Sequence, residues 1–132
     1  MNKVSIEVAE SEIKKWLDYK KIGPTKQEQN KDNIKALAEA ISEGVLSINE
    51  EFEIVHALKF PIKEEIETVE LRYKPRIAVK HVHQHMAGVK ADNVDGRILA
   101  YVAVLTGKPK ALLASLDSED YSICTSIAVF FL

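Results

Sequence analysis

The spacing of apolar residues changes twice along this chain, and this change constrains the fold more than any other feature. Between residues 45 and 74 the spacing is two, which is typical of strands with one buried face. Turn residues at 49–50 and 61–65 divide the stretch into a short three-stranded antiparallel meander. The apolar faces are predicted to contain Phe52, Ile54, His56, Leu58 and Phe60 in the second strand and Val69, Leu71 and Tyr73 in the third. His56 lies on such a face, so we expect a hydrogen-bonded structural histidine.

The first 44 residues have the apolar spacing of helices, three and four. A first helix is expected to stop at Gly23 and Pro24, a common kind of helix end. A second helix is expected to start at a capping box of Thr25 and Glu28 and to end at Gly44. The apolar stripes contain Ile13, Trp16, Leu17 and Ile22 in the first helix and Ile34, Leu37, Ala38 and Ile41 in the second. We expect both helices to pack on the core or on a second copy of the chain.

From Pro75 onward the pattern is helical again, which predicts a helical bundle over residues 75–132. Pro75 fits the first position of a helix. A second helix, residues 98–105, is apolar nearly all round and is therefore expected to be buried. Gly107 is expected to end this helix as a left-handed cap. Pro109 is expected to open the next helix. The stripe of the first of these helices contains Ala78, Val82, Met86 and Val89. The start of the last helix is expected to comprise the cap Asp117, the weak capping-box residue Asp120 and the hydrophobic staple of Leu116 and Tyr121.

Together these patterns predict an α+β fold in a single domain, residues 1–132. Residues 1–44 form its helical N-terminal region and residues 45–132 its core. A length of 132 residues is enough to bury a core unaided, and the 46% hydrophobic content excludes a disordered chain.

The charge and the cysteine content narrow the class of protein. The net charge of −2 is unlike that of a bulk nucleic-acid binder, and Cys124 is the only cysteine, so no intrachain disulfide can form. The first residues lack a signal-peptide pattern, and the longest apolar runs are shorter than the roughly 20 residues of a membrane span. We therefore expect a cytoplasmic protein without membrane or nucleic-acid partners.

The stretch KHVHQHM places three of the four histidines within five positions. On a helix, His81 and His85 share a side while His83 points away. At most two of these histidines could therefore bind the same metal ion. The glutamate of an HExxH motif is missing, and no third ligand is nearby. We therefore predict no metal, no cofactor and no catalytic residues. A metal-dependent enzyme ranks third among the candidate functions, after the two described below.

A basic run without acidic residues lies between positions 71 and 91; it contains Arg72, Lys74, Arg76, Lys80 and Lys90. It could be a solvated face, or it could dock an acidic partner segment or nucleic acid. Because two helices follow with Gly88 between them, a small helix-turn-helix-like DNA-binding regulator is the alternative function. Against it, the second helix offers little besides Asp95 and Arg97 to contact DNA.

The chain contains, in order, HALKFPI, ETVELRYKPRI, a helix pair, LTGKPKALLASLDSEDY and an apolar terminal helix. This arrangement, over residues 54–132, resembles the phage tail assembly chaperone family of Mu-like and related contractile-tailed phages. The pieces that carry the resemblance are Pro61, the VELRYKP strand end, LTG at 105–107 and LDSEDY at 116–121. The first 44 residues exceed the part that matches.

The resemblance implies a non-enzymatic role. Members of the family keep the long, aggregation-prone tape measure protein soluble while the tail tube polymerises, and they are absent from the finished particle. It implies a phage or prophage protein of the bacterial cytoplasm whose partner is the tape measure protein, with the tail tube protein as a further candidate. A second copy of the chain is a candidate on the separate ground of the N-terminal helices. The family has no catalytic residues to transfer.

A chaperone of this kind needs surface that buries apolar area on a client. The basic run, the stripe of the histidine-bearing helix and the apolar end IAVFFL are the candidates, although the last two could simply complete the core. The predicted partner-binding residues are Arg76, Lys80, Val82, Met86, Phe130, Phe131 and Leu132. For the two adjacent phenylalanines we expect that one ring anchors the last helix and the other contacts a partner.

Overall fold

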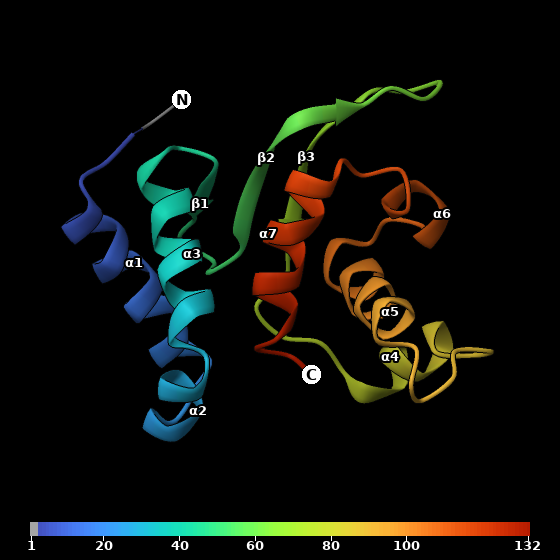
Figure 1. Cartoon of the computed structure of the whole chain (residues 1–132), viewed down its shortest axis with the longest axis horizontal. Helices are drawn as coiled ribbons and strands as arrows, with labels where there is room; N and C mark the ends of the chain where they lie inside the picture. Colours follow the sequence, from blue (N-terminus) through green and yellow to red (C-terminus); the bar gives the residue numbers. More distant parts are fainter. Residues whose placement is uncertain (1–2) are drawn as a thin grey trace.

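A computed structural model describes residues 3–132 of the chain and shows an α+β fold, as the apolar spacing predicts (Figure 1). N-terminal helices precede an antiparallel sheet, and further helices follow it. The elements in order are α1 (Ile6–Tyr19), α2 (Pro24–Gln29), α3 (Lys31–Ser42), β1 (Leu46–Ile48), β2 (Ile54–Ile62), β3 (Thr68–Tyr73), α4 (Val79–His85), α5 (Val94–Thr106), α6 (Lys110–Leu113) and α7 (Ser118–Ala128).

The first helix forms where the apolar stripe predicts it. Ser5 caps α1, because its side chain accepts a hydrogen bond from the N–H of Val8. The buried face contains Ile13, Trp16 and Leu17, as expected. The face is thereby directed at α3 and the sheet, and the other sides of α1 are left to solvent.

The prediction of a single second helix, from Thr25 to Gly44, is wrong in two respects. The helix is divided at Asn30 into α2 and α3, because Asn30 has a φ of −116° and a ψ of 24°, outside the helical range. The capping box of Thr25 and Glu28 does not form, since Gly23 is the cap residue and no side chain caps α2. The apolar stripe that continues into α3 still packs against the core.

The sheet of the described chain has the order β1-β2-β3, with antiparallel neighbours. His56 pairs with Leu46 on one side and with Leu71 on the other. The pairing of β2 with β3 then slips: β2 advances five positions from Ala57 to Ile62, while β3 advances only two. This bulge leaves backbone groups of β2 without a partner in the β3 ladder.

The slip and the length of the hairpin explain why the predicted apolar faces are only partly buried. Ile54, Leu71 and Tyr73 are buried, whereas Phe60 and Val69 are about half exposed. Phe52 lies outside β2 with a φ of 61°, and its ring stacks on that of Tyr19. We call residues 60–69 the hairpin arm; it projects beyond the helices at the upper right of Figure 1.

The main apolar cluster joins both halves of the chain. In Figure 1, α1 and α3 lie on one side of β2 and β3, α4, α5 and α6 lie on the other, and α7 lies in front of the sheet. Side chains from α1, α3, all three strands, α5, α6 and α7 contribute to this cluster. The largest of them include Trp16, Leu37, Tyr73, Leu105 and Ile127.

In the last third of the chain, several helix ends lie where the sequence predicts them and one does not. Gly107 is the left-handed cap of α5, with a φ of 71°, and the N–H of Gly107 donates to the carbonyl of Ala103. Pro109 immediately precedes α6, as predicted. Pro75, however, lies in a loop, and α4 begins only at Val79. No helix among residues 3–132 is long and apolar enough to cross a membrane.

Candidate functional site

A cleft of about 600 Å³ lies between the segment after β3, helix α4 and the turn from α5 to α6. It combines parts of the basic run with two of the clustered histidines and with a second basic segment 30 residues further along the chain. The lining residues are Lys74, Arg76, Ile77, Ala78, His81, His85, Ala103, Val104, Gly107, Lys108 and Pro109. We call this the basic cleft.

Backbone contacts fix two walls of the basic cleft. The N–H of Lys74 donates to the carbonyl of Leu105 at 3.0 Å, which ties the end of β3 to the end of α5. Beyond Leu105, the positive φ of Gly107 turns the chain so that Lys108 faces the same space. The ammonium of Lys20 donates to the carbonyl of Pro75 at 3.0 Å and thereby anchors the other end of this wall to α1.

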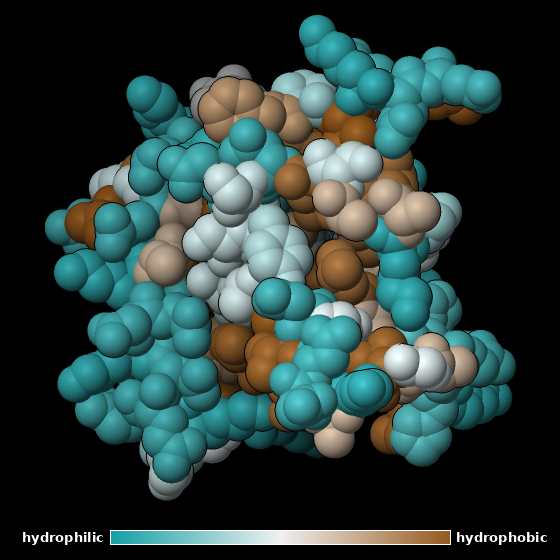
Figure 2. Space-filling view, turned by 45° about the vertical axis from the view of Figure 1, so that its right-hand side comes forward, coloured by the Kyte–Doolittle hydropathy of each residue, from teal (hydrophilic) through white to brown (hydrophobic). Residues whose placement is uncertain are grey.

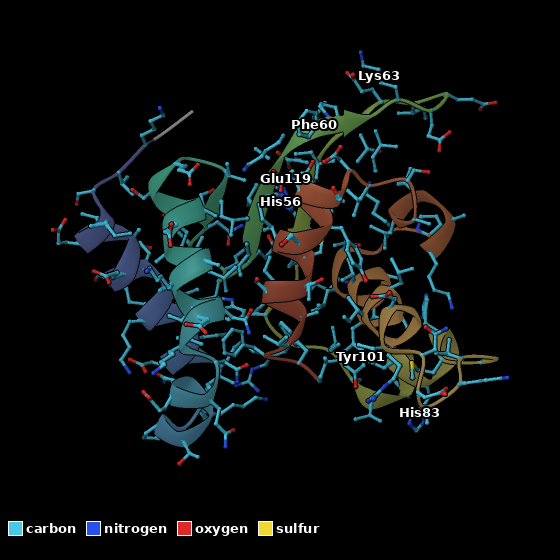
Figure 3. The ribbon with its side chains drawn as sticks, in the orientation of Figure 1. His56, Phe60, Lys63, His83, Tyr101 and Glu119 are labelled. Carbon is cyan, nitrogen blue, oxygen red and sulfur yellow. The ribbon has the colours of Figure 1, made fainter. Side chains whose placement is uncertain are left out.

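Helix α4 supplies the third wall, with His81 and His85 one turn apart. The Nδ1–H of His85 donates to the carbonyl of His81 at 3.1 Å, and this assigns the tautomer because a carbonyl only accepts. The ammonium of Lys110 donates to the carbonyl of His85 at 2.7 Å, which joins α6 to α4. His83 lies on the outer side of α4, away from the body of the protein, as predicted (Figure 3).

The rim of the basic cleft is positively charged and lacks a neutralising partner. Within residues 3–132 no carboxylate lies within 4.0 Å of the charged groups of Lys74, Arg76 or Lys108. The floor is apolar, with Ile77 and Val104 among its residues. Such a site suits an acidic segment that also carries an apolar side chain.

The positive charge also affects a neighbouring amine. The pKa of Lys20 is lowered from 10.5 to about 8, first by burial and then by the charges of Arg76 and Lys26. Arg76 itself lies over the ring of Tyr19, 5.7 Å from its centre. The N-terminal helix therefore contributes to the electrostatics of the basic cleft.

The predicted partner-binding residues are dispersed in the structure. Arg76 lines the basic cleft, and Lys80 is exposed on α4 but does not line it. Val82 is buried against the body of the protein, and Met86 is half-buried at the end of α4. Neither the apolar stripe of α4 nor the cleft continues to the C-terminus.

The C-terminal residues among these predictions lie beyond the end of α7. Phe130 is only 2% exposed, so its ring is not available to a partner in this conformation. The rings of Phe130 and Phe131 both lie edge-on to Trp16, at 5.9 and 6.0 Å, and the ammonium of Lys20 lies 3.6 Å from the ring centre of Phe131. Leu132 is 46% exposed. Both rings contact Trp16, but Phe130 is buried whereas Phe131 is partly exposed, and a contact between Phe131 and a partner stays a prediction.

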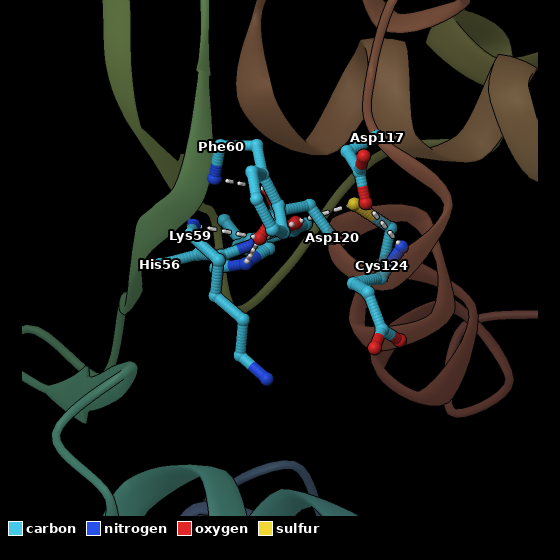
Figure 4. A network of polar contacts seen from close by, with 8 residues as sticks. His56, Lys59, Phe60, Asp117, Asp120 and Cys124 are labelled. Carbon is cyan, nitrogen blue, oxygen red and sulfur yellow. Dashed lines mark hydrogen bonds and ion pairs between the residues drawn. The ribbon is translucent and has the colours of Figure 1, made fainter.

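A buried polar network connects α7 to the sheet (Figure 4). The Nε2–H of His56 donates to the carboxylate of Asp120 at 3.2 Å, and Nδ1 therefore accepts from the hydroxyl of Tyr73 at 3.0 Å. The hydroxyl oxygen of Tyr73 in turn accepts from the thiol of Cys124 at 2.9 Å. The direction of each hydrogen bond follows from the single proton of a neutral imidazole and the ionised carboxylate.

The carboxylate of Asp120 also compensates for the bulge in β2. It accepts from the N–H of Lys59 at 2.9 Å and from the N–H of Phe60 at 3.0 Å, the groups that the register slip leaves unpaired. The predicted capping role of Asp120 is therefore wrong, because its side chain points to the strand and not back along the helix. Asp117 alone caps α7, by accepting from the N–H of Glu119.

The network is structural, as predicted for His56. His56 and Asp120 are fully buried, and burial raises the pKa of the Cys124 thiol to about 11, so the thiol stays protonated at neutral pH. Sequence reasoning missed Asp120 as the partner, since a carboxylate at the third helical position equally predicts a capping box. The interacting positions are 64 residues apart, a distance at which no local pattern operates.

For metal binding, the described residues contain no group of three or more histidine, cysteine, aspartate or glutamate side chains placed around one point. For DNA binding, α5 is unsuited to enter a groove, because residues along most of its length are buried in the molecule. The absence of nucleic-acid partners stays a prediction.

The chain is thus an α+β protein with a cleft on its surface that is lined by basic and apolar residues. Comparisons with known proteins find no relative: no family model matches this sequence, and no characterised protein or solved structure is similar to it.

Proposed function

We propose that this chain is a phage tail assembly chaperone, a non-enzymatic protein that binds the tape measure protein and keeps it soluble while the tail tube assembles. The proposal starts from the resemblance of residues 54–132 to that family. One structural observation supports it: the basic cleft combines an apolar floor with the cations of Lys74, Arg76 and Lys108, none of which has a carboxylate within 4.0 Å among residues 3–132.

The basic cleft has the chemistry to bind a helical client. A helix of a long coiled-coil protein carries apolar residues on one side and charged residues beside them. An apolar side chain placed near Ile77 and Val104 would be buried, while flanking carboxylates would meet Lys74, Arg76 and Lys108. Binding of this kind needs burial and charge complementarity but no chemical step.

Co-expression with the tape measure protein of the same phage tests the proposal. We expect the chain to co-purify with that protein and to increase its soluble fraction. The variant Arg76→Glu with Lys108→Glu reverses two charges of the basic cleft and should abolish co-purification, since acidic client residues would then be repelled. A matched variant, Lys3→Glu with Lys35→Glu, changes two exposed lysines elsewhere and should bind normally.

Two results would contradict the proposal. If the wild-type chain neither binds the tape measure protein nor changes its solubility, the chaperone function is wrong. If both charge-reversal variants bind as well as the wild type, the client is held elsewhere and the basic cleft is not its site.

A further inference from the structure

The hairpin arm is exposed over most of its length, and its charge is opposite to that of the basic cleft. Its tip contains Glu64, Glu65 and Glu67 beside a single Lys63. Ile66 stands among these carboxylates with 83% of its surface exposed, the highest fraction among the large apolar residues of the described chain. Figure 2 shows the arm at the upper right as a mainly hydrophilic projection.

An apolar side chain as exposed as Ile66 requires an explanation. A β-branched residue at a hairpin tip gains nothing from solvent, and turn positions ordinarily contain Gly, Asn, Asp or Pro. The three glutamates form no ion pair within 4.0 Å among the described residues. Only Glu64 is fixed, by a hydrogen bond of 3.5 Å from the hydroxyl of Ser115. Glu65, Ile66 and Glu67 therefore remain available to another molecule.

We propose that the hairpin arm of one copy of this chain docks into the basic cleft of a second copy. Ile66 would contact the apolar floor formed by Ile77 and Val104. The carboxylates of Glu65 and Glu67 would meet the cations of Lys74, Arg76 and Lys108 at the rim. Among residues 3–132 neither group of charges has an ion-pair partner, and the two groups have opposite signs. The contact would therefore bury the Ile66 side chain and pair the carboxylates of the arm with the cations of the cleft.

The arm cannot occupy the cleft of its own chain. In Figure 1 the arm lies at the top of the C-terminal half and α4 lies at the bottom, and Figure 3 likewise places Lys63 far from His83. Docking therefore joins different surfaces of two copies, which is a heterologous contact. Such a contact produces a ring if the rotation closes and an open chain of copies if it does not.

The inference concerns the same cleft as the proposed function but needs no client. In the absence of the tape measure protein, copies of the chain would fill one another's clefts. A client segment that binds the cleft would then compete with the arm, so client binding and self-association exclude each other at each cleft.

Charge-reversal variants of the protein alone test the inference by sedimentation and light scattering over a range of concentrations. The wild type should associate, and the association should weaken as salt rises from about 0.05 M to about 0.5 M, because exposed ion pairs are screened. The arm variant Glu65→Lys with Glu67→Lys and the cleft variant Arg76→Glu with Lys108→Glu should each raise the dissociation constant roughly tenfold or more.

Complementation distinguishes docking from a general charge effect. A mixture of the arm variant and the cleft variant should associate again, because every arm then finds a cleft of opposite charge in the other variant. A single chain with all four substitutions should also associate, since its reversed arm matches its reversed cleft. Ile66→Ser should weaken association without changing net charge.

Three results would overturn the inference: a wild type that is monomeric throughout the concentration range, an association that either variant leaves unchanged, or variants that fail to complement each other. The arm variant separates this inference from the proposed function. It should be monomeric and yet bind the tape measure protein, because its cleft is intact. A failure of self-association alone leaves the proposed client site standing, and a failure of client binding alone leaves the docking of copies standing.

Discussion

At the scale of single residues, Asp120 joins helix α7 to strand β2. Its carboxylate binds the imidazole of His56 and two consecutive backbone N–H groups of β2, and it has no access to solvent. Hydrogen bonds to a charged acceptor are stronger than neutral ones, and an unpaired buried group is costly. The residue thereby fixes the position of α7 on the sheet.

The variant Asp120→Asn tests this role. An amide cannot accept from His56 and both N–H groups at once, because one of its two polar atoms is a donor. We expect a loss of about 2 to 3 kcal/mol in the free energy of unfolding, measured by urea denaturation. Asp117→Asn is the matched control on the same helix, and it should change stability by only a few tenths of a kcal/mol because asparagine caps helices as well as aspartate. Equal effects at the two positions would show that Asp120 acts only as part of the first helical turn.

The same network predicts how stability depends on pH. The pKa of His56 lies below its ordinary value of 6.5, chiefly because burial disfavours the charged imidazole, although the Asp120 carboxylate opposes this shift. Below about pH 6.5 the unfolded chain therefore binds a proton that the folded chain does not, and the free energy of unfolding decreases as pH falls. Melting temperatures measured from pH 8 down to pH 5, at about half-unit steps, should show this decline.

The variant His56→Gln should reduce stability at neutral pH and also flatten the decline below about pH 6.5. His83→Gln replaces an exposed imidazole and should leave the profile as in the wild type. A His56→Gln profile parallel to that of the wild type would assign the pH dependence to other groups.

At the scale of elements, the chain after α7 closes the core. Phe130 and Phe131 lie beyond the last residue of the helix and pack on Trp16 of α1, so the segment after α7 contacts the first helix. Aromatic contacts thereby hold the segment after α7 against α1. The apolar character of IAVFFL is explained mainly by this contact.

The two phenylalanines should differ in their effect on stability. Phe130→Ala removes a buried ring and should cost about 3 to 5 kcal/mol, measured by urea denaturation. Phe131→Ala removes a partly exposed ring that contacts the ammonium of Lys20, and it should cost only about 1 to 2 kcal/mol. If either substitution leaves stability unchanged and weakens binding of the tape measure protein, that ring contacts the client and the burial seen here does not describe the bound state.

Helix α4 permits a prediction about metal ions. The Nδ1 of His85 is engaged with the helix backbone, so His81 and His85 offer at most an incomplete pair of ligands. Stoichiometric Zn²⁺ or Ni²⁺ should leave the melting temperature almost unchanged, because weak binding stabilises a fold little at that concentration. A rise of many degrees that disappears in His81→Ala would reveal a metal site on this helix.

At the scale of the whole molecule, the N-terminal helices belong to the same core as the rest. Trp16 and Leu37 contribute to the main apolar cluster together with Leu71 and Leu105. This bears on the proposed function, which rests on residues 54–132, because these residues alone would leave one side of the sheet and of α7 uncovered. The N-terminal region is thus required to bury the common core.

Removal of residues 1–44 tests this conclusion. We expect the fragment 45–132 to lack cooperative thermal unfolding and to show the poorly dispersed amide spectrum of a chain without fixed packing, because it loses the cover of α1 and α3. Full-length protein is the control. A fragment that unfolds cooperatively would establish residues 45–132 as an independent domain and the N-terminal region as an addition to it.

Periodicity by itself determined which regions are helical and which form strands, but not where every helix begins, ends or divides. The change from a spacing of three and four to a spacing of two, and back, predicted the α+β class, and Gly107 and Asp117 marked helix ends correctly. The periodicity of helices and strands and the caps of helices depend on interactions between residues one or two turns apart. Such interactions can be recognised from a short stretch of sequence. The predictions at Asp120 and Pro75 were wrong because each residue type is compatible with more than one role. Asp120 binds the strand instead of capping the helix, and Pro75 lies in a loop instead of starting a helix.

Tertiary structure alone decided which surfaces exist. The basic cleft joins residues 74–85 to residues 103–109, and the burial of Phe130 depends on Trp16 at the other end of the chain. Phe60 has the same place in the strand pattern as Leu58, yet the bulge and the projection of the hairpin leave it exposed. Such outcomes depend on packing between segments distant in sequence, because burial is a property of the folded assembly of elements and not of any one of them.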